Sequence, residues 1–303
     1  MKGKKCIVSL DTVVIIGSLE HEEKFYCAVR KYQSSNPSKR FNLSAYGVNV
    51  YAPDGTRISA DFNGYDPKRV RIEINPSKAD FFQLSFLLSC LRDIRLQRLD
   101  VALDFIGYEI QDYEFHCTRL GYANHRLSRK AFPHSYAFGE GASHRRIAVY
   151  DRMEKCRVDR VDDVRIIDLD GVVHVIPVWN LRLNDVGWFR VELRLKGNWL
   201  VDSLEPKHTA LDDFIAKQRI ASSLDLSIHC EAMMEYLSNH PAEIRRLNRN
   251  TQTKYRKLLR KAQVENGLNP DPTEVYRDNY FMICDAIKRI LTLGSQKGDE
   301  SDE

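Results

Sequence analysis

Three short segments of the chain place acids, bases and a tyrosine at the spacing of a β-strand. They are RLDVALDF (98–105), RRIAVYD (145–151) and WFRVELRL (188–195). Because side chains alternate between the two faces of a strand, Asp100 and Asp104 share one face of the first segment, and the opposite face is wholly apolar. The pattern predicts a half-buried strand with an acidic face.

The other two segments carry complementary groups in the same alternation. Glu192 lies between Arg190 and Arg194 on the polar face of its strand, and Tyr150 shares a face with Arg146. If the three strands are neighbours in one sheet, their polar faces form a single surface that holds carboxylates, a tyrosine and several arginines.

Such a surface suits the chemistry of a phosphodiester. Carboxylate oxygens are ligands that Mg²⁺ or Mn²⁺ prefer, and the ion orients a phosphate for attack. The Tyr150 hydroxyl could form a covalent protein–DNA intermediate, while Arg190 and Arg194 compensate the developing charge. The candidate metal ligands are Asp100, Asp104 and Glu192.

Simpler interpretations of the same residues stay open at this point. Polar strand faces are usually solvated, and rows of arginine and carboxylate are ordinary cross-strand ion pairs. A tyrosine in a strand is commonly a packing residue.

The elements that position these segments follow from the hydrophobic periodicity. Alternating segments predict strands at 5–16, 24–32, 45–52, 56–62 and 69–74, before the three segments described above. A helix is predicted over 77–91 with Ser77 as its N-cap, and a hairpin insertion over 156–187 with its turn at Asp170-Gly171. Beyond residue 205 the period becomes helical, and helices are predicted at 209–221, 225–239, 243–266 and 272–292.

Together these elements predict an α+β fold, with a curved, mostly antiparallel sheet, packed helices and a helical C-terminal region. We expect a catalytic α+β unit over 1–200, a helical region over 201–293 and a disordered acidic tail over 294–303.

Composition limits the class of protein. A chain of 303 residues with 43% hydrophobic and 29% charged residues is neither a short peptide fold nor wholly disordered. The seven cysteines stand singly, with no C-x-x-C pair, which argues against a zinc site or a disulfide framework and favours the cytoplasm. No apolar stretch approaches the roughly 20 residues that span a bilayer, so no membrane partner is expected.

The net charge of +4 is small but unevenly distributed. Residues 119–155 carry eight Lys and Arg against three acids, with aromatics interleaved, which suits single-stranded DNA. Residues 245–261 carry eight bases and no acid, which on a helix could lie along duplex DNA, although a solvated helix face is the alternative. The candidate DNA contacts are Arg145, Arg146, Arg152, Lys155, Arg245, Arg246, Lys254, Arg256 and Lys257.

In this order, RLDVALDF, FGEGASHRRIAVYDRMEK (138–155) and RVELRL (190–195) resemble the replication initiation factor family, the Rep_trans-type rolling-circle initiators and relaxases of plasmids, phages and integrative elements. The family's nucleophile is the tyrosine of an I-x-x-Y-[DN]-K strand, here Tyr150, with Arg152 in place of the usual lysine. Its metal carboxylates fall on the three ligands named above. Its glycine-serine-basic element appears here in a looser form that contains Ser143, a further candidate DNA contact.

The resemblance implies a metal-dependent endonuclease that nicks one strand at a double-stranded origin and transfers it. Such an enzyme becomes linked to the 5′ phosphate and leaves a 3′-OH for a host polymerase. It also recruits a host helicase, binds single-stranded DNA and often acts as a homodimer.

Two rival functions are distinguishable by experiment. A non-catalytic DNA-binding regulator of replication or transcription would function normally after Tyr150→Phe. A metal-dependent nuclease that uses water would still cleave after that substitution but would require Glu192.

Overall fold

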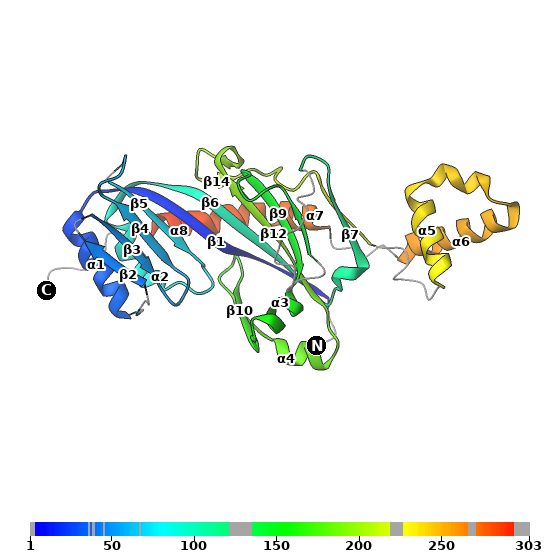
Figure 1. Cartoon of the computed structure of the whole chain (residues 1–303), viewed down its shortest axis with the longest axis horizontal. Coiled ribbons are helices and arrows are strands. Elements are labelled where there is room, and N and C mark those ends of the chain that lie inside the picture. Colours follow the sequence, from blue (N-terminus) through cyan, green and yellow to red (C-terminus); the bar gives the residue numbers. More distant parts are fainter. Residues whose placement is uncertain are drawn as a thin grey trace.

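A nine-stranded antiparallel sheet organises the main body of the molecule (Figure 1). The computed structural model describes residues 4–35, 37, 40–44, 46–66, 68–120, 135–218, 227–265 and 271–293. From edge to edge the strands are β2 (Arg40–Ser44), β3 (Gly47–Tyr51), β4 (Arg57–Asp61), β5 (Arg69–Ile74), β1 (Lys5–Leu19), β6 (Leu91–Ile106), β12 (Trp188–Lys196), β9 (Arg145–Asp151) and β8 (Ser135–Phe138). With helices packed on this sheet, the predicted α+β class is confirmed.

The other elements lie around the sheet and beyond it. The helices are α1 (Glu22–Ser35), α2 (Phe81–Leu88), α3 (Arg152–Val158), α4 (Val178–Leu183), α5 (Ile228–Asn239), α6 (Arg249–Glu265), α7 (Pro272–Asp278) and α8 (Tyr280–Thr292), with 3-10 turns η1 (Ile110–Asp112), η2 (Gly197–Trp199) and η4 (Pro241–Arg246). Three two-stranded pairs are formed by β10 (Asp163–Ile167) with β11 (Val173–Pro177), β13 (Leu200–Val201) with β14 (Glu205–Pro206), and β15 (Phe214–Gln218) with β7 (Tyr113–Cys117).

The long strands β1 and β6 join two parts of the sheet. β5 pairs with the second half of β1, from Val13 to Ser18, and carries β4, β3 and β2 beyond it. β12 pairs with the second half of β6 and carries β9 and β8. The register between β1 and β6 shifts at three places, the first between Leu10 and Thr12. Both parts therefore share one continuous pair of strands.

The hydrophobic core lies on one face of this sheet. Leu99, Val101 and Leu103 of β6 are fully buried there, as their alternation predicts. α8 crosses the same face, behind the strands in Figure 1, and adds Ile283 and Ile287, one helical turn apart. The polar face on the other side keeps the acids and arginines.

A hairpin forms within the segment predicted as an insertion. β10 and β11 pair through a turn in which Gly171 has a φ of +86°, a conformation that favours glycine. The hairpin packs with α3 and α4 in a small apolar core that includes Ile7 and Trp188 of the sheet.

Two predicted elements differ in the structure. The strand expected at 24–32 is wrong, because this segment forms α1, with an acid pair in its first turn and Phe25, Val29 and Tyr32 buried at helical spacing. The helix expected from Ser77 begins instead at Phe81, because the Asp80 side chain accepts the N–H of Gln83 and caps it.

The predicted helical region is distributed over two places. α5, η4 and α6 enclose a core of their own and stand apart from the sheet (Figure 1), whereas α7 and α8 pack on the sheet. The helix expected at 209–221 is wrong, since residues 214–218 form β15, whose Phe214 stacks on Phe115 of the main core with ring centroids 6.1 Å apart. The predicted tail, 294–303, lies outside the described residues.

Candidate active site

The sheet makes the three polar strands neighbours, in the order β6-β12-β9. In their register Arg190 lies between Asp104 and Tyr150, and Glu192 lies between the small residues Ala102 and Ala148. The single surface that the alternation predicted is therefore formed.

Asp100 and Asp104 of β6 are fully buried beneath this surface and paired with arginines. The Asp104 carboxylate accepts from the indole N–H of Trp188 at 2.8 Å and from two N–H groups of Arg190 at 2.8 and 2.9 Å. Asp100 accepts from Arg98, whose Nε lies at 2.8 Å, and from Arg194 at 3.1–3.2 Å. These pairs fix the arginines in place.

Tyr150 and Glu192 form the contact at the centre of the site. The Tyr150 hydroxyl donates to Oε2 of Glu192 at 3.3 Å, and the Nη2 atom of Arg194 lies 3.6 Å from Oε1. Tyr150 is 8% exposed. The pair therefore sits at the bottom of the surface, with the tyrosine hydroxyl directed at a carboxylate that can receive its proton.

The environment raises the pKa of both partners. Burial first, and then the negative charges of Asp11 and Asp100, raise the pKa of the Glu192 carboxyl. Burial also raises the pKa of Tyr150 well above its usual range, against the opposing charge of Arg190. A raised carboxyl pKa makes Glu192 a better proton acceptor than an exposed glutamate.

Two cations reach the tyrosine from α3. The Asp151 side chain accepts the N–H of Glu154 and caps this helix directly after the tyrosine strand. The helix then places the Lys155 ammonium 4.9 Å from the centroid of the Tyr150 ring, and Arg152 against Trp188. Burial, with the charge of Arg152 second, lowers the pKa of Lys155.

Asp11 is a site residue that the sequence analysis missed. It lies at the first register shift of β1, and its Oδ1 is 2.7 Å from an Nη of Arg190. Burial raises the pKa of Asp11, but the charges of Arg190, Arg152 and Lys155 outweigh it and hold the pKa below its usual value. The available signal was the acid itself, which interrupts the apolar run from Ile7 to Ile16.

A cleft of about 700 Å³ opens beside these groups, lined among others by Asp11, Arg152, Lys155, Arg165 and Arg190. Among the residues that the structure describes, Arg146 and Arg152 each keep a buried Nε with no hydrogen-bond partner. Guanidinium groups with unused donors suit an oxyanion such as phosphate.

The predicted metal ligands do not form a metal site. Within the described ranges no group of three His, Cys, Asp or Glu is arranged to hold an ion. The physical reason is that Asp100 and Asp104 turn their oxygens to arginine and tryptophan donors. Glu192 and Asp11 keep partial exposure, 17% and 27% of their side chains.

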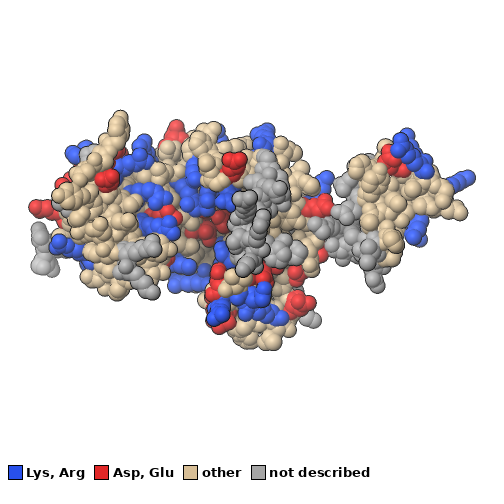
Figure 2. All heavy atoms as spheres, in the orientation of Figure 1, with Lys and Arg blue, Asp and Glu red and all other residues tan. Residues whose placement is uncertain are grey.

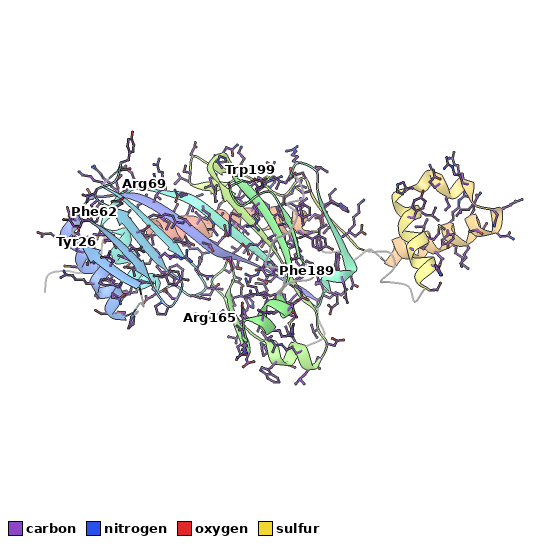
Figure 3. The ribbon with its side chains drawn as sticks, in the orientation of Figure 1. Tyr26, Phe62, Arg69, Arg165, Phe189 and Trp199 are labelled. Atoms are coloured by element: carbon purple, nitrogen blue, oxygen red, sulfur yellow. The ribbon has the colours of Figure 1, made fainter. Side chains whose placement is uncertain are left out.

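Arg145 differs from its prediction as a DNA contact. It is 1% exposed, makes a bidentate ion pair with Asp213 at 2.5 and 2.7 Å, and lies 4.4 Å from the centroid of the Trp199 ring. Trp199 is labelled in Figure 3. The role of Arg145 is therefore to tie β9 to the segment before β15. The pairing lowers the pKa of Asp213 to about 2, against burial.

The loop before the tyrosine strand needs its glycine. Gly139 has a φ of +81°, and a Cβ there would lie 2.7 Å from the carbonyl oxygen of Arg145. In the same turn the Ser143 N–H donates to Glu140, and Ser143 is half-buried. Residues 121–134, which contain much of the predicted basic and aromatic stretch, lie outside the described residues.

The second basic run lies far from the sheet, on η4 and α6 (Figure 2). One side of α6 buries Tyr255 in the small core, so the helix is amphipathic. Five predicted DNA contacts here are exposed, namely Arg245, Arg246, Lys254, Arg256 and Lys257. Arg246 also pairs with Glu243 at 2.8 Å.

Comparison with known proteins finds similar chains, and no family model matches. The chain is 24% identical over 268 residues to a replication initiation protein of Staphylococcus aureus, which covers 84% of this chain and 75% of that protein. The rolling circle replication initiator protein of Geobacillus stearothermophilus aligns with 64% of this chain and 76% of its own, at 13% identity and a TM-score of 0.35. No helix in the described part of the chain is long and apolar enough to cross a membrane.

The sequence similarity extends well beyond the three polar strands. It therefore supports the resemblance to the replication initiation factor family that those strands carry.

Proposed function

We propose that this chain initiates rolling-circle DNA replication by cutting one strand of an origin, with the Tyr150 hydroxyl as the nucleophile. The observation that carries the proposal is the contact of that hydroxyl with Glu192 at 3.3 Å, on a surface bordered by Arg190, Arg194 and Lys155. The name of the Staphylococcus aureus relative supports the choice of replication over other DNA transactions.

The residues supply each part of the reaction. Tyr150 Oη attacks the phosphorus as its proton passes to Glu192, and the bond from phosphorus to the 3′ oxygen breaks. That oxygen leaves with the bonding electrons and takes a proton from water. The products are a 5′-phosphotyrosine linkage and a 3′-OH primer, while Arg146 and Arg152 offer their unused donors to the phosphate oxygens.

Metal dependence, with Mg²⁺ or Mn²⁺, stays a prediction from the sequence resemblance. The reaction above includes no metal step, because two of the three predicted ligands are engaged by arginines. Addition of EDTA to the assay below tests the prediction separately.

The test is adduct formation on supercoiled DNA. We would incubate the protein and Mn²⁺ with negatively supercoiled plasmid carrying the DNA around its own gene, denature the sample, and look for DNA that stays bound to protein. Wild type is expected to give nicked circles with a denaturation-resistant adduct, and Tyr150→Phe neither.

Tyr136→Phe is the matched control, since Tyr136 lies on the adjacent strand β8 and packs on the core. It should form the adduct normally. Nicking that survives Tyr150→Phe without an adduct would establish the nuclease that uses water. Tight origin binding without any nick in wild type would establish the regulator.

A further inference from the structure

The polar face of the active site continues without interruption onto the N-terminal strands. One cross-strand row runs from β12 to β3 and consists of Lys196, Arg98, Val14, Glu73, Arg57 and Tyr51. The next row consists of Arg95, Ile16, Arg71, Ser59, Asn49 and Asn42. Rows on one face are about 6.8 Å apart, so this second row lies roughly 27 Å from the row of Tyr150 along the strands.

This N-terminal part of the face is rich in arginine. Ile16 of β1 lies between Arg71 of β5 and Arg95 of β6. One row farther along, Ser18 lies between Arg69 and Arg92 of the same two strands. Val14 and Ile16 point to this polar side yet are 0% and 6% exposed, as expected where arginine stems lie over them. Glu73 pairs with Arg71 at 2.7 Å and lies 4.0 Å from Arg98, while Arg69 and Arg95 are exposed. Figure 2 shows Lys and Arg gathered over these strands.

The same strands enclose a groove of about 660 Å³. Its walls are polar. They include Asn42, Asn49, Ser59, Arg69 and Arg71, together with the acids Asp61 and Asp66.

Two exposed tyrosines stand at one edge of this groove. Tyr46 precedes β3 and Tyr65 follows β4, and the Phe62 N–H donates to the carbonyl of Tyr46, which joins the two turns. The Tyr46 side chain is 71% exposed and Tyr65 is fully exposed. Exposed aromatic rings beside arginines are the arrangement that grips unpaired bases and their phosphates.

We propose that this groove, on the polar face of β2–β5, binds single-stranded DNA and holds the strand that Tyr150 cuts. The inference rests on the proposed function for the identity of the strand. A duplex is disfavoured as the occupant, because its stacked bases offer no face to Tyr46 or Tyr65. The continuity of the face places the groove on the path of a strand that leaves the active site.

Binding of a labelled oligonucleotide, dT30, tests the proposal. The full chain carrying Tyr150→Phe is used so that no strand is cut, and fluorescence anisotropy gives Kd over a range of salt. Adding Tyr65→Ala is expected to weaken binding about five-fold or more, from the lost stacking of one base. Adding Arg69→Ala with Arg95→Ala is expected to lower the slope of log K against log salt by about 1.4, since each phosphate contact contributes about 0.7.

The matched controls lie on the helices at the other side of the sheet. Arg30→Ala on α1 and Phe82→Ala on α2 remove an exposed arginine and a 64% exposed aromatic, and should leave Kd and salt slope unchanged. All of these side chains are exposed, so an unchanged melting temperature shows that every variant folds.

Groove variants that bind dT30 like the controls, or that lose duplex binding alone, would overturn the inference. The adduct assay separates this result from a failure of the proposed function. If wild type forms the adduct but the groove variants bind dT30 normally, only the proposal that the groove binds single-stranded DNA is rejected. Weakened binding in those variants without an adduct in wild type rejects the nicking function only.

Discussion

In the proposed reaction, the Glu192 carboxylate accepts the proton that the Tyr150 hydroxyl loses. Its Oε2 atom accepts a hydrogen bond from the Tyr150 hydroxyl at 3.3 Å, and its pKa is raised by burial and by neighbouring acids. A carboxyl group accepts a proton only when it is ionised. Adduct formation should therefore increase with pH through a pKa above the usual value for glutamate, and fall as the pH drops below it.

Glu192→Gln removes the acceptor while keeping the shape of the side chain. We expect the rate of adduct formation to fall by about 10²–10⁴-fold, with the acid limb of the pH profile lost from the remaining activity. Single-turnover rates between pH 4 and 8 measure both effects. Glu20→Gln, an exposed glutamate at the end of β1, is the control and should keep the wild-type profile. A Gln variant with wild-type rates would contradict the role of Glu192 as the acceptor.

At the scale of elements, the Arg145–Asp213 pair holds the tyrosine strand against the segment that leads into β15. Removing one partner of a buried ion pair leaves the other charge without compensation. Asp213→Asn is therefore expected to lower the free energy of unfolding by about 3–5 kcal/mol, measured by urea denaturation. An Asp212→Asn control alters an exposed carboxylate that pairs with Arg277, and should cost less than about 1 kcal/mol.

The same pair predicts a dependence of stability on pH. In the folded protein the pKa of the Asp213 carboxyl is about 2, below the usual 3.8. The stabilisation by the ion pair is therefore present above pH 4 and is lost as the pH falls toward 2. Wild type should lose stability over this window, and Asp213→Asn should lose less. Parallel losses in the two proteins would contradict the assignment.

The elements also show what alternation alone can predict. The polar faces of β6, β9 and β12 were predictable because the period of a strand is local. That these three strands are neighbours in one sheet could not be predicted from alternation, because it depends on which strands pair. Asp11 was not predicted as a site residue because its position depends on a bulge in β1. Arg145 was wrongly predicted as a DNA contact because Asp213, 68 residues later, pairs with its buried guanidinium group. The helix α1 was missed because its apolar side is narrow and its exposed side is rich in charge.

At the scale of the molecule, the sheet and the helices α5 and α6 offer two separate basic surfaces. If α6 binds duplex DNA as predicted, changing Lys254, Arg256 and Lys257 to Ala together should weaken duplex binding and lower its salt slope by about 2.7. Adduct formation on a single-stranded oligonucleotide should be unaffected. Electrophoretic mobility shifts on duplex, compared with adduct yields on oligonucleotide, provide the measurement. Equal losses in both assays would contradict a division of labour between the two surfaces.

The route of the chain through α5 and α6 has a geometric consequence. The polypeptide leaves the body after β15 and re-enters it at α7, so these helices are fastened at both ends. The returning stretch, residues 266–270, can reach no farther than about 20 Å. This maximum length corresponds to roughly six base pairs of duplex at 3.4 Å each. If Tyr150 cuts the strand as proposed, a duplex bound by α6 would lie within a limited distance of it, and origins would tolerate only small changes in the spacing between the bound element and the nick.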